Sequence, residues 1–170
     1  MTTWMWLLLL FIIGQRLLEL KIAKRNEKWM KERGGIETGK EHYKWFLIVH
    51  SLFFISIFLE VSLQNRMDHS LNYFLLSLFI VLQTLRIWCI VSLGRFWNTK
   101  IIVLPRVALI KKGPYKYVDH PNYIIVGMEL FVIPLLFGAY VTTFVFPILH
   151  LILLKIRIPK ETEALSMLSK

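Results

Sequence analysis

The sequence predicts an all-α integral membrane protein of about five transmembrane helices, and three observations support this fold class. Hydrophobic residues make up 56% of the 170 residues, the net charge is +10, and the basic residues lie between long apolar runs. A soluble domain has about 45–50% apolar residues with glycine included, so one soluble core does not explain this composition. The basic residues do not line one soluble face, which argues against nucleic-acid binding. A single cysteine excludes an internal disulfide framework.

The spans are predicted by length, because a hydrocarbon core about 30 Å thick needs roughly 20 helical residues to cross it. In one domain of residues 1–170, the five predicted spans are about residues 4–20, 45–63, 71–93, 123–137 and 140–154. The first run, WMWLLLLFIIGQRLLEL, lacks the basic start and cleavage site of a signal peptide, which favours a retained span. We expect its helix to continue as far as Arg33, where Gly34 and Gly35 end it.

The second and third runs are each long enough to cross the bilayer alone. The fourth and fifth runs are short and are joined only by Gly138 and Ala139. This spacing predicts a tight helical hairpin at the C-terminal end of the bundle.

The distribution of lysine and arginine predicts the orientation of the chain. The segments after the first, third and fifth spans hold eighteen of the 21 basic residues, whereas the segment of residues 64–70 holds only Arg66. Basic segments favour the cytoplasm, so we expect the N-terminus outside and the C-terminus inside the cell. The same charges are expected to attract anionic membrane lipids without any particular substrate.

Residues that suit chemistry are concentrated where the third loop enters the fourth span. This stretch reads GPYKYVDHPNY, from Gly113 to Tyr123. Its Gly-Pro and His-Pro pairs favour turns, and Pro121 suits the first turn of a helix, where a missing N–H costs nothing. We therefore expect His120, Asn122 and Tyr123 at the cytoplasmic mouth of the fourth span. They suit an adenine or a carboxylate, but an interfacial belt of tyrosines with a helix cap explains them equally well.

A second cluster, RIPKETEAL, follows the fifth span and contains Arg157 and Glu161. A guanidinium group can hold a substrate oxygen, and a carboxylate can accept hydrogen bonds from ribose hydroxyls. The alternative is a basic flank followed by a solvated amphipathic tail. No metal site is predicted, because the five histidines show no ligand spacing with one another or with Cys89.

The two clusters and the hydrophobic hairpin between them resemble the isoprenylcysteine carboxyl methyltransferase family of integral membrane methyltransferases. The family pattern is Gly-Pro-Tyr-(Arg/Lys)-Tyr-x-x-His-Pro-x-Tyr, a hairpin, and Arg-x-x-x-Glu, and the resemblance covers about residues 90–165. Residues 15–43 are similar to the small Bacillus-type members, which act as O-methyltransferases on long-chain alkylpyrones. Asp119 stands where many members have arginine, and Glu161 and Thr162 stand where many have paired glutamates.

The resemblance implies that S-adenosylmethionine binds in a cytoplasm-facing pocket formed by the third loop, the start of the fourth span and the C-terminal segment. The implied cofactor contacts are His120, Pro121, Tyr123 and Glu161, with Tyr115 and Tyr117 as further candidates. Arg157 is the implied catalytic residue and would orient the acceptor oxygen near the methyl group. The implied acceptor is a lipid, and no metal is required.

Five charged residues fall in or near the apolar spans: Arg16, Glu19, Glu60, Arg86 and Glu129. Such residues face the bundle interior, pair with one another or mark a pathway. Arg16 and Glu19 have i,i+3 spacing and are expected to pair on one helix. Glu129 and Arg86 are candidate substrate-binding residues, although their structural pairing with each other is the favoured explanation.

The leading functional prediction is a S-adenosylmethionine-dependent O-methyltransferase with an alkylpyrone or related polyketide lipid as acceptor. A prenylcysteine carboxylate is the second acceptor. An NADPH-dependent membrane reductase stays open, because membrane sterol reductases have a similar His-Pro-x-Tyr turn, but they are longer and have more spans. A non-enzymatic membrane scaffold is the remaining alternative.

Overall fold

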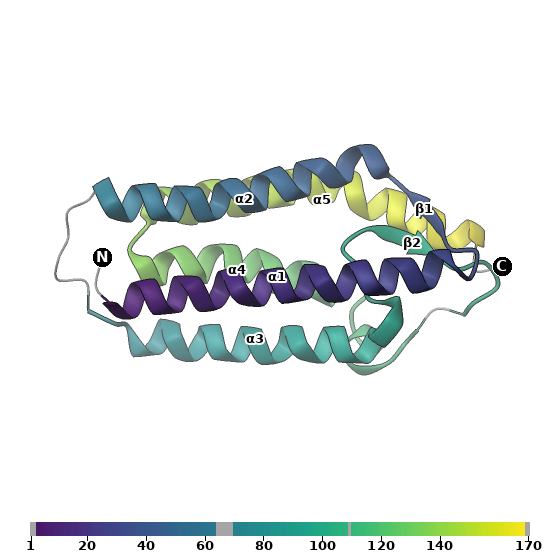
Figure 1. The fold of residues 1–170 in the computed structure, drawn as a ribbon, viewed down its shortest axis with the longest axis horizontal. Coiled ribbons are helices and arrows are strands. Elements are labelled where there is room, and N and C mark those ends of the chain that lie inside the picture. Colours follow the sequence, from purple (N-terminus) through teal and green to yellow (C-terminus); the bar gives the residue numbers. More distant parts are fainter. Residues whose placement is uncertain (1–2, 64–69, 109, 169–170) are drawn as a thin grey trace.

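The computed structural model describes residues 3–63, 70–108 and 110–168, and these form an all-α bundle with one small sheet, which confirms the predicted fold class. In chain order the elements are α1 (Thr3–Lys31), β1 (Ile36–Thr38), α2 (Lys40–Leu63), α3 (Tyr73–Leu93), the 3-10 turn η1 (Gly94–Phe96), β2 (Ile101–Val103), the 3-10 turn η2 (Gly113–Lys116), α4 (Pro121–Phe137) and α5 (Tyr140–Leu168). The helices run side by side, and both strands lie with the C-terminus at one end, here called the capped end (Figure 1).

Three helices are long and apolar enough to cross a membrane by length and composition: Lys40–Leu63, Tyr73–Phe96 and Tyr140–Ser166. α4 is a shorter apolar helix of 17 residues, and α1 is not among the three. Membrane crossing by α1 and α4 therefore stays a prediction. Large apolar side chains cover the outside of the bundle, and Leu7 and Phe74 are 64% and 74% exposed. Lipid rather than water suits such a surface.

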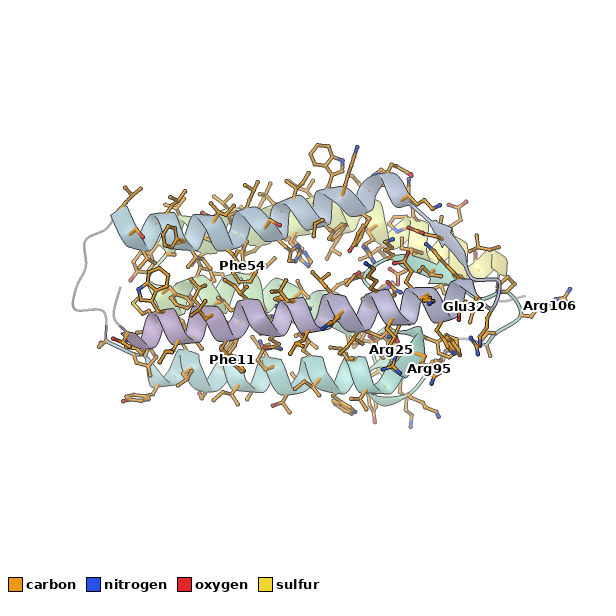
Figure 2. All side chains as sticks on the ribbon, viewed as in Figure 1. Phe11, Arg25, Glu32, Phe54, Arg95 and Arg106 are labelled. Atoms are coloured by element: carbon orange, nitrogen blue, oxygen red, sulfur yellow. The ribbon has the colours of Figure 1, made fainter. Side chains whose placement is uncertain are left out.

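Charged side chains gather at the capped end. Arg25, Glu32, Arg95 and Arg106 all lie there, whereas Phe11 lies in the apolar half of the molecule (Figure 2). The bundle thus has one basic end, as the sequence predicts. Which side of the membrane this end faces stays a prediction, and the segment that contains Arg66 lies outside the described residues.

The first helix and the hairpin end close to where the sequence predicts. α1 ends at Lys31, and Gly34 then adopts a φ of 83° that favours glycine. α4 begins at Pro121 and stops at Gly138, whose left-handed φ is 70°. The amide of Ala139 donates to the carbonyl of Pro134 at 2.8 Å and closes the turn into α5. The tight hairpin is confirmed.

The fifth helix is longer than the predicted span, which ended at residue 154. α5 continues to Leu168 with Pro147 and Pro159 inside it. Arg157 and Glu161 are therefore one turn apart on a helix that packs against β1 and β2, the two strands here called the cap, and they do not belong to a solvated tail. Their i,i+4 spacing places both side chains on one helical face.

A small antiparallel sheet holds the first and third loops together, and the all-α prediction did not include it. Ile36 of β1 pairs with Val103 of β2. The side chain of Asn26 in α1 donates to the carbonyl of Trp97 at 2.7 Å and to that of Gly94 at 3.1 Å. These bonds fix the start of the third loop against α1 and so position one wall of the candidate site.

Glu60 on α2 caps the start of α5 and so explains one of the charged residues within the apolar spans. Its carboxylate accepts hydrogen bonds from the amides of Val141 and Thr142 at 2.8 and 2.9 Å. The hydroxyl of Thr142 donates to the same carboxylate at 2.8 Å. The first amides of a helix lack partners within the helix, and a negative charge there also complements the helix dipole.

Candidate active site

The two sequence clusters meet at the capped end, where α4 begins and α5 passes beside it. The hydroxyl of Tyr123 donates a short hydrogen bond to Glu161 and accepts one from Nε of Arg157 at 2.7 Å. The ring of His120 stacks on the ring of Tyr123, with centroids 5.3 Å apart. Nδ1 of His120 lies 3.9 Å from Glu161. Four of the predicted site residues therefore form one connected group.

Arg157 is held in place from several directions. Its Nη2 donates to the carbonyl of Thr99 at 2.7 Å, and its Nε bonds to Tyr123. The guanidinium carbon lies 4.9 Å from the ring centroid of Phe46 and 5.5 Å from that of Tyr123. Arg157 is 8% exposed, so its charge is largely withdrawn from water. Such a fixed, partly desolvated guanidinium is suited to hold an oxygen atom with negative character.

A cavity of about 440 Å³ opens beside this group, and we call it the loop cavity. Its walls come from the third loop, β2, the start of α4 and the end of α5. Tyr115, His120, Tyr123, Arg157 and Glu161 all line it. The structure therefore brings these predicted residues to one pocket.

Three of the weaker candidates have distinct positions. Tyr117 is 77% exposed and does not line the loop cavity, and Pro121 is buried as the first residue of α4. Tyr115 is half-buried in η2. Burial, together with the nearby Cys89 and Glu161, raises the pKa of the Tyr115 phenol above its usual range, so it is a neutral hydroxyl at pH 7.

A second cavity of about 270 Å³ lies inside the bundle, and we call it the bundle cavity. All five helices contribute to its lining, which is mainly apolar. Leu17 of α1 and Leu47 of α2 line it and are themselves 61% and 48% exposed. The cavity therefore reaches the outer, lipid-compatible surface between α1 and α2.

The two cavities are separated by a shared wall. Five residues line both of them: Trp97, Asn98, Asn122, Tyr123 and Arg157. Among the described residues, neither Nε1 of Trp97 nor Oδ1 of Asn122 has a hydrogen-bond partner, although both atoms are buried. Buried polar atoms without partners are rare in folded proteins. A bound molecule that contacts the shared wall would give these atoms partners.

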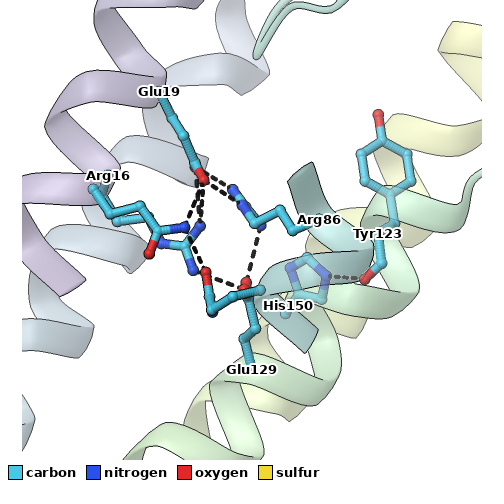
Figure 3. Close-up of polar contacts among 8 residues, drawn as sticks. Arg16, Glu19, Arg86, Tyr123, Glu129 and His150 are labelled. Carbon is cyan, nitrogen blue, oxygen red and sulfur yellow. Dashed lines mark hydrogen bonds and ion pairs between the residues drawn. The ribbon is translucent and has the colours of Figure 1, made fainter. Parts of the chain in front are cut away.

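Four charged residues form a cluster deeper in the bundle, here called the intramembrane charge cluster: Arg16, Glu19, Arg86 and Glu129. Nη2 of Arg86 lies 2.6 Å from Glu19, and its Nη1 lies 2.9 Å from Glu129 (Figure 3). Arg16 bridges the same two carboxylates at 2.9 Å each, so its expected pairing with Glu19 is confirmed. Two cations and two anions make the cluster neutral.

The intramembrane charge cluster joins three helices and also lines the bundle cavity. It ties α1, α3 and α4 together, so the pairing of Arg86 with Glu129 is confirmed as a structural contact. All four side chains also line the bundle cavity. Contact with a substrate by Arg86 or Glu129 therefore stays a prediction. Gln83 adds a hydrogen bond to Glu129 at 2.7 Å.

The sequence does not single out the shared-wall residues Trp97 and Asn98, and it places Asn122 at the mouth only as one of three residues that suit an adenine or a carboxylate. Their common signal is position, because each lies within five residues of the end or start of a predicted span. That signal does not identify which side chains turn inward. The structure contains no group of three or more potential metal ligands within its described ranges.

Comparison with known proteins extends the resemblance seen in the sequence. The model of the isoprenylcysteine carboxyl methyltransferase (ICMT) family matches residues 75–167. The chain is similar to "Uncharacterized protein YpbQ" of Bacillus subtilis, with 44% identity over 160 residues, 94% of this chain and 95% of the relative. It is also similar to an "Uncharacterized protein" of Haemophilus influenzae, with 30% identity over 156 residues, 91% of each chain. No solved structure matches.

Proposed function

This chain belongs to the isoprenylcysteine carboxyl methyltransferase family of membrane methyltransferases, and from that premise we propose that it is an O-methyltransferase that uses S-adenosylmethionine and a membrane lipid. The observation that carries the proposal is the shared wall. It places Arg157 and Tyr123 between the loop cavity at the capped end, which is the more polar of the two, and the mainly apolar bundle cavity. A polar methyl donor and a lipid acceptor approach from those two sides.

The residues of the loop cavity fit S-adenosylmethionine. About 440 Å³ lies within the range of small-molecule sites, roughly 300–1,000 Å³. Glu161 and Asp119 offer carboxylates for ribose hydroxyls or an ammonium group, and the stacked His120 and Tyr123 present an aromatic edge. The unpartnered N–H of Trp97 suits a carboxylate. When bound, the cofactor supplies an electrophilic methyl group on a sulfonium.

The bundle cavity supports an amphiphilic acceptor. Its apolar lining suits an alkyl chain, and its opening beside Leu17 and Leu47 gives that chain a path from the bilayer. The polar end of the lipid then lies at the shared wall, beside Arg157. We favour an alkylpyrone or related polyketide lipid, on the resemblance of residues 15–43 to the Bacillus-type members. A prenylcysteine carboxylate is the second acceptor that this geometry accommodates.

Arg157 acts by holding the acceptor oxygen in line with the methyl group. Thr99 and Tyr123 fix two of its nitrogen atoms, and among the described residues none accepts a hydrogen bond from Nη1. That nitrogen is free to donate to an oxygen of the acceptor. Catalysis by this site is mainly positioning, and correct alignment of two reactants is able to supply several kcal/mol of the barrier, up to about 7–11.

Replacing Arg157 tests this role. Arg157→Lys keeps the charge but cannot reach Thr99, Tyr123 and the acceptor together, so methyl transfer should fall at least tenfold, which corresponds to about 1.4 kcal/mol. The affinity for S-adenosylmethionine should change less than the rate. The measurement is single-turnover transfer of a labelled methyl group to an alkylpyrone. Arg25→Lys, at an exposed position, is the matched control. Unchanged transfer by Arg157→Lys would remove Arg157 from the mechanism.

A further inference from the structure

A buried histidine in the bundle cavity has a ring nitrogen without a partner. His150 of α5 is 2% exposed and lines this cavity. Its Nδ1 is buried and has no hydrogen-bond partner among the described residues. The reaction proposed above does not use this side chain. An unsatisfied polar atom next to a substrate-sized space indicates a ligand contact.

The other ring nitrogen fixes the protonation of the imidazole. Nε2 of His150 lies 3.2 Å from the backbone carbonyl of Tyr123 (Figure 3). A carbonyl oxygen only accepts hydrogen bonds, so Nε2 must carry the proton and donate it. In a neutral ring, Nδ1 is then an unprotonated nitrogen with a free lone pair. Such a nitrogen is able to accept a hydrogen bond, and subsequently a proton, from a hydroxyl that reaches it.

His150 is held close to the shared wall. Tyr123 bonds to His150 through its carbonyl and to Arg157 through its hydroxyl. The ring of Phe46 contacts both residues, with its centroid 6.4 Å from that of His150 and 4.9 Å from the guanidinium of Arg157. Arg157 lies seven residues further along α5, and helical side chains lean back toward the N-terminus. Both side chains line the bundle cavity, so an acceptor that occupies it passes both.

Two further neighbours restrict the orientation of the ring. The ring of His50 on α2 lies 6.2 Å away, edge to face. Gly127 on α4 faces the ring, since a Cβ there would lie 3.5 Å from Cδ2 of His150, an ordinary van der Waals contact. The position of the imidazole is therefore determined by packing, which suits a residue that must meet a reacting hydroxyl in one orientation.

We propose that His150 is the proton acceptor for a hydroxyl-bearing lipid, an enol or a phenol, in the methyl transfer proposed above, on which this inference rests. The acceptor oxygen forms a bond to the methyl carbon, and the bond from that carbon to the sulfonium sulfur breaks, with its electron pair left on sulfur. The O–H bond of the acceptor breaks, and its proton moves to Nδ1 of His150. The imidazolium releases this proton to water after the methyl ether departs.

This role specifies the chemical class of the acceptor. A hydroxyl lipid that enters an apolar cavity from the bilayer is neutral, because burial disfavours the ionised form. Its oxygen is a weak nucleophile until a base removes the proton. A carboxylate acceptor has no proton to lose and would leave Nδ1 of His150 without a function. The free nitrogen therefore favours an enol or phenol over a prenylcysteine carboxylate.

The test is His150→Gln, because glutamine keeps an amide N–H that can donate to the carbonyl of Tyr123 but has no basic nitrogen. With a long-chain 4-hydroxy-2-pyrone in detergent micelles, transfer by the variant should fall by about a hundredfold or more. Affinity for S-adenosylmethionine should stay within about twofold. In the absence of S-adenosylmethionine, the affinity of the His150→Gln variant for the pyrone should be about fivefold lower than that of the parent chain, as expected for the loss of one hydrogen bond. His42→Gln at the start of α2 is the matched control.

A measurement on the unaltered protein avoids dependence on the folding of the variant. Transfer to the hydroxypyrone should be slower in D₂O, whereas transfer to an S-prenylcysteine should not change. Equal hydroxypyrone rates for His150→Gln and the parent chain, or the absence of the solvent isotope effect, would overturn the role of His150. Failure of the proposed function looks different, because the parent chain would then bind no S-adenosylmethionine or methylate neither acceptor.

Discussion

At the scale of single residues, the site depends on Tyr123. Its ring stacks on His120, its hydroxyl joins Arg157 to Glu161, and its carbonyl binds His150. One side chain thus connects the two sequence clusters, and its backbone adds a contact with the bundle interior. A change confined to the hydroxyl isolates the first of these functions.

Tyr123→Phe keeps the ring but removes the hydroxyl that positions Arg157. Hydrogen bonds to charged groups contribute about 1.5–3 kcal/mol, so we expect methyl transfer to fall by roughly 10–150-fold. Single-turnover rates measure this effect separately from cofactor affinity. Tyr140→Phe, at the opposite end of the bundle, is the control and should stay close to the parent rate. A variant as active as the parent would show that Arg157 needs no support from Tyr123.

The intramembrane charge cluster gives a second prediction at this scale. Glu129→Gln removes one of two anions and leaves an excess positive charge in a buried site, so the free energy of unfolding should fall by about 3–5 kcal/mol. The double variant Arg86→Met with Glu129→Leu removes a pair and should cost less than Glu129→Gln alone. Unfolding in detergent micelles measures both.

An exposed ion pair is the control for the charge cluster. Lys28 and Glu32 lie 4.0 Å apart with side chains 81% and 56% exposed, so Glu32→Gln should change the stability by less than about 1 kcal/mol. Equal losses for Glu129→Gln and Glu32→Gln would contradict the structural role of the cluster.

At the scale of elements, an ion-pair network holds the cap that supports the loop cavity. Nζ of Lys31 lies 2.6 Å from Glu37 of β1, and Nζ of Lys100 lies 2.7 Å from Glu27 of α1. Burial alone would raise the pKa of Glu37, but the ammonium groups of Lys31 and Lys100 outweigh it and lower that pKa. The same balance lowers the pKa of Glu27.

These lowered pKa values set the pH dependence of the cap. A carboxyl group whose pKa is lower in the folded protein stabilises the fold above its unfolded value of about 4.5, and this stabilisation is lost as the pH falls through the lowered folded value. We therefore expect affinity for S-adenosylmethionine to be constant near neutral pH and to weaken as the pH falls below about 4.5. Glu37→Gln should make that decline shallower. An unchanged decline in this variant would exclude Glu37 as a cause.

At the scale of the whole molecule, the sequence predicts the parts of the fold that depend on local chemistry. The apolar runs, the turn at Gly138 and the helix start at Pro121 follow from length and backbone preference, and the structure confirms them. The pairing of Arg86 with Glu129 was foreseeable because charges in an apolar span need partners. The continuation of α5 beyond residue 154 was not, because Pro159 argues against helix locally, whereas packing against the cap favours it.

The parts that the sequence does not predict depend on contacts between distant segments. β1 and β2 join the first loop to the third. Each contains only three residues, which is too short for an alternating pattern of apolar and polar residues to predict a strand. The shared wall combines Trp97, Asn122 and Arg157 from three separate segments. The motif residues at the site are recognisable in the sequence, but the cavity on their other side is not.

The most direct test of the central claim is a calorimetric titration of the purified protein in detergent micelles with S-adenosylmethionine and, separately, with NADPH. We expect saturable binding of S-adenosylmethionine that Glu161→Gln weakens about tenfold, as expected for the loss of one charge-assisted hydrogen bond. We expect no saturable binding of NADPH. Binding of NADPH in place of S-adenosylmethionine, or of neither molecule, would contradict the assignment of the loop cavity as the site of a methyl donor.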